Sequence, residues 1–220
     1  LVKLNTVANQ DPKIVKVEDI QKKFAEVLTN AIKAGTSAKG ADSSNYLNWI
    51  SLGRVYESVS SPNLKIKGAY ESAELSYVEA LRRNPKNPAI LVILSRLSAV
   101  QGDLDKARDY SLQAIKLKNN YLDAYFTLSQ IEVSDNNITG AIDAVTASSI
   151  IDPTNSAIFF QLGLLKYNIK DLKGAIEALE KAITMTPDYA NAKYFLGLSY
   201  EAVGLHEKAI AQFTDLKKTK

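Results

Sequence analysis

The sequence holds few of the residue types that carry out chemical reactions. It has one histidine, His206, and no cysteine, so it lacks the several converging groups that a metal centre or a catalytic triad needs. Carboxylates are numerous, but Asp171, Glu177 and Glu180 fall on the outward faces of expected helices, where a solvated charge is the ordinary role. The ten glycines form no phosphate-binding loop. We therefore expect no catalytic residue, no metal site, no cofactor and no enzymatic activity.

Charge and hydropathy argue against two further classes of function. The chain carries 27 basic and 24 acidic residues, and their interleaving gives no basic stripe for nucleic acid. No apolar run approaches the roughly 20 residues of a membrane span. The chain begins at Leu1 without an initiator methionine, which suggests a piece of a longer protein. We expect membrane attachment only through other parts of such a parent, and a location in the cytoplasm or in the extramembrane domain of an envelope protein.

A period of 34 residues organises most of the chain. Leu162 and Gly163 recur one period later as Leu196 and Gly197, and a period this regular indicates a repeat array. Within residues 156–189, apolar residues at helical spacing form two stripes on either side of a polar stretch. The pattern predicts two antiparallel amphipathic helices, which approach closely at the small residues Gly163 and Ala175.

This pattern resembles the tetratricopeptide repeat (TPR), a helix-turn-helix unit of 34 residues. The resemblance implies an all-α fold, a TPR solenoid of antiparallel helix pairs in a right-handed superhelix. Two departures stand out: Lys193 replaces the large residue of the first helix in the last unit, and Glu132 stands where an aromatic residue is common. The positions that carry the resemblance are Leu52, Leu94, Leu128, Leu162 and Leu196, the alanines Ala73, Ala107, Ala141, Ala175 and Ala209, and the small residues Gly53, Ser95, Ser129, Gly163 and Gly197.

The resemblance divides the chain into a leading part and five units. Residues 1–45 are expected to form a partial leading repeat, with a long helix from about Val17 to Ala38. The first full unit exceeds the period by eight residues, and the loop at about 58–68 is either a contact site or a harmless insertion. The five units are 46–87, 88–121, 122–155, 156–189 and the truncated 190–220.

The last unit lacks the additional helix that usually covers the end of a TPR array. We therefore expect its apolar side chains to be partly exposed, and a possible homo-oligomer to form through this uncapped C-terminal face. The side chains concerned are Ala209, Ile210, Phe213 and Leu216.

The family's geometry implies a concave groove lined by the fifth and ninth positions of each unit. Arg54 and Arg96 would suit carboxylates, and the aromatic residues of later units would anchor apolar side chains of a bound protein or peptide segment. The alternative is that the aromatics only pack between adjacent first helices. The predicted groove residues are Ile50, Arg54, Val92, Arg96, Phe126, Gln130, Phe160, Leu164, Tyr167, Tyr194 and Leu198.

Three functions remain open. The first is a non-catalytic scaffold that binds a peptide in the groove, and the second is an assembly module. The third comes from residues 45–59 and 68–88, which resemble the TPR tails of bacterial membrane proteins related to O-antigen ligases and polymerases. That resemblance implies an extramembrane tail of a protein that handles lipid-linked glycans. The carboxylate clamp of chaperone-tail binders is not matched, because the corresponding sites are Ile50, Arg54, Ile93, Asp123 and Thr127.

Overall fold

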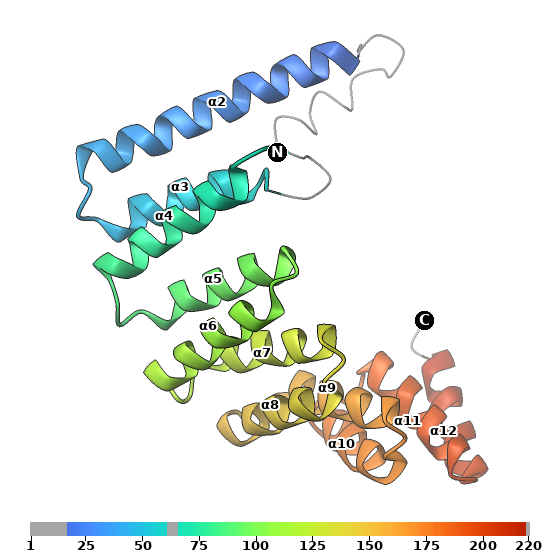
Figure 1. Cartoon of the computed structure of the whole chain (residues 1–220). Helices are drawn as coiled ribbons and strands as arrows, with labels where there is room; N and C mark the ends of the chain where they lie inside the picture. The colour runs from blue at the N-terminus through green and yellow to red at the C-terminus, as the bar shows by residue number, and fades with distance from the viewer. Residues whose placement is uncertain (1–16, 61–65, 219–220) are drawn as a thin grey trace. The chain divides into compact units, whose positions relative to one another are not determined.

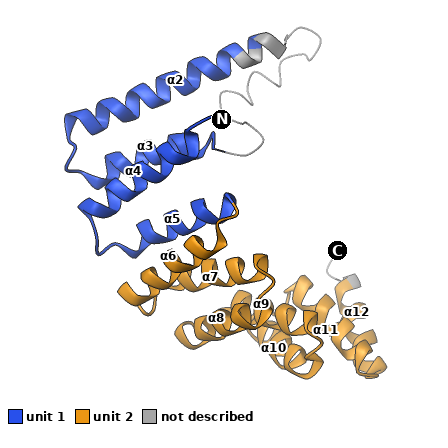
Figure 2. Cartoon of the chain, in the orientation of Figure 1, with its two compact units in different colours: residues 1–101 blue, residues 102–220 orange. Residues whose placement is uncertain are grey.

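The computed structural model describes residues 17–60 and 66–218 (Figure 1). These ranges contain eleven α-helices and no strand, so the predicted all-α fold is confirmed. No described helix is both long enough and apolar enough to cross a membrane. Contacts divide the chain into unit 1, residues 1–101, and unit 2, residues 102–220 (Figure 2). Unit 1 contains α2 (Val17–Ala41), α3 (Tyr46–Glu57), α4 (Ala69–Arg83) and α5 (Pro88–Val100).

Unit 2 contains the other seven helices. The first helix of each successive helix pair begins at a fixed interval. Helices α7, α9 and α11 begin at Leu122, Ser156 and Ala190, which are 34 residues apart. The helices are α6 (Leu104–Leu117), α7 (Leu122–Ser134), α8 (Ile138–Ile151), α9 (Ser156–Asn168), α10 (Leu172–Met185), α11 (Ala190–Ala202) and α12 (His206–Lys218). The division of the whole chain into five repeats stays a prediction.

Short polar residues cap the N-termini of α6, α8, α9 and α10 in unit 2. The Asn155 side chain accepts a hydrogen bond from the Ala157 amide at the start of α9, and Asp171 accepts one from Gly174 at the start of α10. Such caps satisfy amides that have no partner within the helix. The tight turns before α8 and α10 use left-handed backbone, with φ of 58° at Asn136 and 65° at Lys170.

In unit 1, α3 pairs with α4 around a buried tyrosine. The ring of Tyr77 lies against Gly53, where an added Cβ would come within 2.5 Å of it, so only glycine fits. The Tyr77 hydroxyl donates to Glu57, and burial followed by this hydrogen bond raises the pKa of Tyr77. The loop predicted at 58–68 joins these helices, but its residues 61–65 lie outside the described ranges, as do residues 1–16 of the leading part.

Helix α2 is longer than predicted and ends at Ala41 instead of Ala38. Glycine has a low helix propensity, but Gly35 packs inside the helix, where an added Cβ would lie 3.0 Å from Leu52 of α3. The Asn48 side chain donates to the Ala38 carbonyl at 3.0 Å, which satisfies a backbone group near the end of the helix. Contacts with α3 therefore override the low helix propensity of this glycine.

The close approach predicted in residues 156–189 is confirmed. A Cβ added to Gly163 would lie 2.6 Å from Leu179 and 3.3 Å from the Ala175 carbonyl, so α9 and α10 touch at this glycine. Gly197 has the same role, since its added Cβ would lie 2.6 Å from the Phe213 ring. The core around these contacts contains Phe159, Ala175, Leu179, Ala182, Ala192, Leu196, Tyr200 and Ala209.

The expected exposure of the last helix is wrong for one residue. Ala209 is only 1% exposed, because it belongs to the core that α12 shares with α11. Phe213 packs partly against the same core, whereas Ile210 is 63% exposed. The apolar surface of α12 is therefore smaller than the sequence pattern indicates.

Candidate functional site

The four predicted groove residues of unit 1 divide into two buried and two exposed side chains. Ile50 and Val92 are 8% and 2% exposed and belong to the core, so they offer a ligand almost no surface. Arg54 and Arg96 are exposed on α3 and α5. The positive charge of Arg54 acts on Tyr77, whose hydroxyl hydrogen-bonds to Glu57. Arg54 is therefore close to a carboxylate of its own unit.

The seven predicted groove residues of unit 2 all retain some exposed surface. Phe126 and Tyr194 are 45% and 48% exposed, which is unusual for large rings in an otherwise packed helical array. Gln130 is also exposed. The other four are half-buried: Phe160, Leu164, Tyr167 and Leu198.

Several of these aromatic rings pack against one another between α9 and α11. Phe195 is the centre of this aromatic cluster, with ring centroids 6.1 Å from Phe160, 5.8 Å from Tyr167 and 5.5 Å from Tyr194. Phe160 also lies 5.0 Å from Tyr189, whose pKa is raised by burial. Packing between first helices, the alternative interpretation, therefore accounts for part of the surface of Phe160 and Tyr167. Phe195 was absent from the predicted set because it is the sixth position of its unit, and the set was built on the fifth and ninth positions with Tyr167 one turn further on.

Phe126, on α7, borders a hollow of about 290 Å³. The hollow lies between the first turns of α7 and α9, beside the C-terminal half of α8. Its lining combines apolar side chains with four polar ones: Leu122, Asp123, Phe126, Ser148, Asn155, Ala157, Ile158 and Gln161. The groove prediction named only Phe126 among them. Helical spacing could have added Asp123, which lies three residues before Phe126 on the same face.

Three polar side chains of the hollow each donate one hydrogen bond within the protein. Ser148 donates to the Ala144 carbonyl at 3.0 Å, and Asn155 donates to Asp152 at 3.1 Å. The Gln161 amide nitrogen donates to the Ser129 hydroxyl at 3.2 Å, which leaves the Gln161 carbonyl oxygen as an acceptor. Asp123 accepts a long hydrogen bond of 3.4 Å from the Tyr121 hydroxyl. The hollow thus offers acceptors and one carboxylate.

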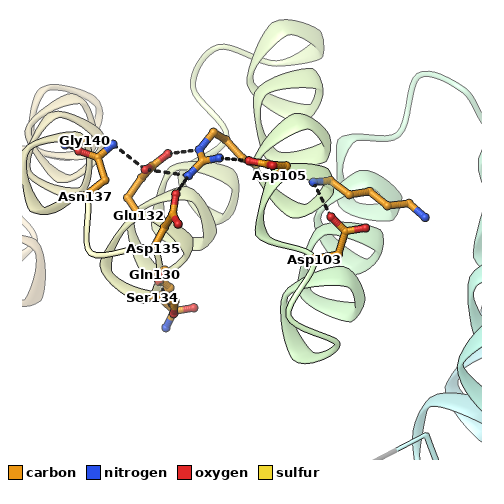
Figure 3. A network of polar contacts seen from close by, with 10 residues as sticks. Asp103, Asp105, Gln130, Glu132, Ser134, Asp135, Asn137 and Gly140 are labelled. Carbon is orange, nitrogen blue, oxygen red and sulfur yellow. Dashed lines mark hydrogen bonds and ion pairs between the residues drawn. The ribbon is translucent and has the colours of Figure 1, made fainter.

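A second polar cluster, at the junction of α6 with α7, is structural. Glu132 is 5% exposed and accepts hydrogen bonds from Arg108 at 2.7 and 3.3 Å and from Asn137 at 2.8 Å (Figure 3). Arg108 also pairs with Asp135 and, at 2.9 Å, with Asp105. The hydrogen bonds to Glu132 and Asp135 raise the pKa of Arg108. This network explains how the repeat at residues 122–155 tolerates a carboxylate where an aromatic residue is common.

The remaining candidates for chemistry have structural partners. Asp171 caps α10 and lies 3.7 Å from Lys166, and His206 contacts Glu201 at 3.0 Å on the surface. Glu180 was expected to be merely solvated, but it accepts a hydrogen bond from the buried Tyr200 hydroxyl. Among the residues that the structure describes, no three His, Cys, Asp or Glu side chains form a metal-binding group.

Two curated proteins contain segments similar to this chain. The human protein O-mannosyl-transferase TMTC1 is 26% identical over 166 residues, which are 70% of this chain and 19% of that protein. The Sol locus transcriptional repressor of Clostridium acetobutylicum is 30% identical over 86 residues, or 39% of this chain and 27% of the repressor. The chain thus aligns with about a fifth to a quarter of the length of these relatives.

Solved structures with the same fold cover more of the chain. MamA residues 41-end from Desulfovibrio magneticus RS-1 superpose with a TM-score of 0.60 at 22% identity, covering 76% of this chain and 93% of that one. YrrB, described as a TPR protein with an unusual peptide-binding site, gives a TM-score of 0.62 at 19% identity, covering 84% and 92%. At these identities the likeness shows the fold alone.

The family itself is shown by a sequence model of the tetratricopeptide repeat. The model matches residues 67–121 and 160–219, which together are more than half of the chain. The stretch between the two matches, 122–159, includes the buried Glu132. The likeness to O-antigen ligases is not confirmed by these comparisons. On the combined sequence and structural match, the chain belongs to the tetratricopeptide repeat family.

Proposed function

We propose that this chain is a non-catalytic TPR scaffold that binds a protein or peptide segment. The segment would lie on α7, α9 and α11, the first helices of successive helix pairs in unit 2. The observation that carries the proposal is the exposed Phe126 ring beside the hollow between α7 and α9. Exposed aromatic side chains next to concave surface are frequent anchors of bound segments, because they bury a large area at low entropic cost. YrrB, a structural neighbour, is itself described as having a peptide-binding site.

Residues on α9 and α11 would extend this surface beyond the hollow. Tyr194 is 48% exposed, and Leu164 and Leu198 are half-buried, so an apolar segment could cover them. Phe160 and Tyr167 would contribute mainly by holding the cluster around Phe195 in place. On unit 1, exposed Arg54 and Arg96 remain proposed contacts for acidic groups of a ligand.

A selection from a random peptide library tests this function. Peptides enriched on the wild-type chain should bind it with micromolar or tighter affinity in fluorescence anisotropy. The Phe126→Ala variant should lose at least tenfold in affinity, which corresponds to about 1.4 kcal/mol. Circular dichroism should show unchanged helicity, since the Phe126 side chain is 45% exposed.

Ile150→Ala is the matched control for loss of apolar surface. Ile150 is 77% exposed on α8 and does not line the hollow. Its replacement should leave peptide affinity within twofold of wild type. Failure to enrich any peptide, or equal losses in both variants, would contradict binding at this surface.

Assembly through α12 is the second candidate, favoured by the 63% exposure of Ile210. A homo-oligomer would bury this side chain, and light scattering coupled to size exclusion would detect it. Ile210→Asp should then return the assembly to a monomer. This variant is a cleaner test than Phe213→Asp, because Phe213 touches Gly197 in the core. A wild-type chain that is already monomeric at high micromolar concentration would argue against assembly.

The extramembrane-tail hypothesis concerns the parent protein. Its support is that a similar segment occurs within a much longer human protein named as an O-mannosyl-transferase. The full-length gene product tests it: adjoining membrane spans would support the hypothesis, and their absence would exclude it.

A further inference from the structure

We propose that the hollow between α7 and α9 binds the arginine side chain of a peptide ligand. The proposal rests on the proposed function and adds the chemical class of the residue that the Phe126 surface recognises. Three independent features of the hollow point to a planar cation: its charge, its hydrogen-bonding groups, and the position of its aromatic ring.

The charge comes from Asp123, the only ionisable side chain in the lining. Within the described ranges, Asp123 accepts one side-chain hydrogen bond, which comes from the Tyr121 hydroxyl and is long at 3.4 Å. The nearby Lys118 ammonium lies 5.4 Å from the centre of the Tyr121 ring. A carboxylate at the rim of a small hollow attracts a cation and disfavours an acidic side chain.

The hydrogen-bonding groups also favour a donor. The Gln161 carbonyl oxygen and the two Asp123 carboxylate oxygens accept hydrogen bonds, whereas the Ser148 hydroxyl and one N–H group of each of the Asn155 and Gln161 amides already donate within the protein. The first turn of α9 offers no compensating donors there, because the Ala157 amide bonds to Asn155 and the Ile158 amide to the Asn155 carbonyl. An anion would therefore find few donors, while a guanidinium, with five N–H groups and no acceptor, matches the surface.

The aromatic ring supplies the third feature. Phe126 follows Asp123 by three residues on α7, so both side chains project from one helix face. A guanidinium held by the carboxylate would lie near the ring, where stacking and cation–π attraction favour it. The hollow, at about 290 Å³, is at the lower end of the roughly 300–1,000 Å³ of small-molecule pockets. This size suits one long side chain better than a cofactor.

The test uses a synthetic peptide of six alanines and one central arginine, blocked at both ends, titrated into the isotope-labelled full chain. Backbone amide shifts near Asp123, Phe126 and Gln161 should change in a saturable manner. A second peptide carries citrulline instead of arginine, which preserves shape and removes the charge. We expect the citrulline peptide to bind at least fivefold more weakly, and a lysine peptide to fall between the two.

Two variants locate the effect. Asp123→Asn should weaken binding of the arginine peptide at least fivefold, while Asp143→Asn, which removes a charge from an exposed site on α8 outside the lining, should change it less than twofold. Both replacements are nearly isosteric, so circular dichroism should show unchanged folding. Equal affinity for citrulline and arginine, shift changes elsewhere, or no saturable binding up to about 20 mM would overturn the proposal.

The outcome is separable from that of the proposed function. Library peptides that depend on Phe126 but tolerate citrulline and Asp123→Asn would support peptide binding and reject the arginine site. An arginine effect without any enriched library peptide would support the site and reject the wider function.

Discussion

Unit 2 joins successive helix pairs in two different ways at the same position of the repeat. The eleventh residue of α7 is Glu132 and the eleventh of α11 is Tyr200, and each hydrogen-bonds to the second helix of the preceding pair. Glu132 binds Arg108 of α6, whereas Tyr200 donates to Glu180 of α10. One junction is therefore a network of charges and the other a tyrosine among apolar and aromatic side chains.

The difference shows that the backbone of this repeat places the eleventh residue of the first helix against the preceding helix pair, whether that residue is a charged or an aromatic one. The charged junction requires both partners, since Glu132 is 5% exposed and a lone carboxylate there would be strongly disfavoured. The aromatic junction distributes its contacts over Phe160, Phe195 and Tyr200, so no single pair is indispensable. We therefore expect a single substitution to lower the free energy of unfolding more at the charged junction than at the aromatic one. Replacing both members of the charged pair together should lower it less than replacing one of them.

Arg108→Ala should have the largest effect. It leaves Glu132 buried without its cation, and breaking a buried pair costs about 3–5 kcal/mol. Because the Arg108 side chain is 24% exposed, we expect about 2–3 kcal/mol in this case. Urea unfolding followed by circular dichroism measures the change in the free energy of unfolding.

A double variant, Arg108→Met with Glu132→Leu, separates the lost pair from lost packing. Replacing both charges by apolar groups of similar volume is often neutral or stabilising, so this variant should recover most of the loss. A double variant no more stable than Arg108→Ala would show that the two junctions do not differ as described.

The helical architecture was predictable from the sequence because small residues mark where helices touch. Gly163 beside Leu179 and Gly197 beside Phe213 leave no space for a Cβ, and such positions recur at a visible interval. The charged junction was not predictable, because Arg108 and Glu132 are 24 residues apart and belong to different helix pairs. Their pairing follows from tertiary contacts that no local pattern encodes.

Phe195→Ala tests the aromatic junction and should have the second-largest effect. Phenylalanine to alanine in a core costs about 3–5 kcal/mol, and since Phe195 is only half-buried we expect about 2 kcal/mol. The same measurement on Phe126→Ala should give less than about 1 kcal/mol, because that ring is 45% exposed. Equal losses in the two variants would contradict the distinction between a packing ring and a binding ring.

Tyr200→Phe should cost about 1 kcal/mol at pH 8, the net value of one hydrogen bond. Burial, and then the hydrogen bond to Glu180, raise the pKa of Tyr200 above its ordinary value of 10.0. The contribution of this raised pKa to the free energy of unfolding of the wild-type protein is fully present below pH 10. It declines as the pH rises toward the pKa of Tyr200 in the folded state. The variant lacks that decline, so the difference in unfolding free energy should close by about pH 11. A constant difference from pH 8 to 11 would exclude this coupling.

The candidate site was only partly predictable for a related reason. The fifth and ninth positions identified exposed Phe126 and Tyr194, because family geometry gives the direction of a side chain on its own helix. The same rule also selected Ile50 and Val92, which are buried by neighbouring helices. It missed Asp123 and Gln161, which reach the hollow only because α7 and α9 lie side by side there. The burial of a side chain and the lining of a cavity depend on how two helices pack. A rule based on positions within a single helix cannot predict either.

Substitutions in the turns before α8 and α10 should change the free energy of unfolding least. Lys170, before α10, and Asn136, before α8, both have left-handed backbone. This conformation costs most residues about 1 kcal/mol, whereas asparagine tolerates it. Lys170→Gly removes that cost but also the contact of the lysine with the Tyr167 ring, so we expect a net stabilisation of about 0.5 kcal/mol. Asn136→Gly should change the free energy of unfolding by less than about 0.3 kcal/mol. If Asn136→Gly stabilised the chain as much as Lys170→Gly, the backbone at Asn136 and at Lys170 would be equally strained. The charged and the aromatic part of unit 2 would then differ only at their junctions.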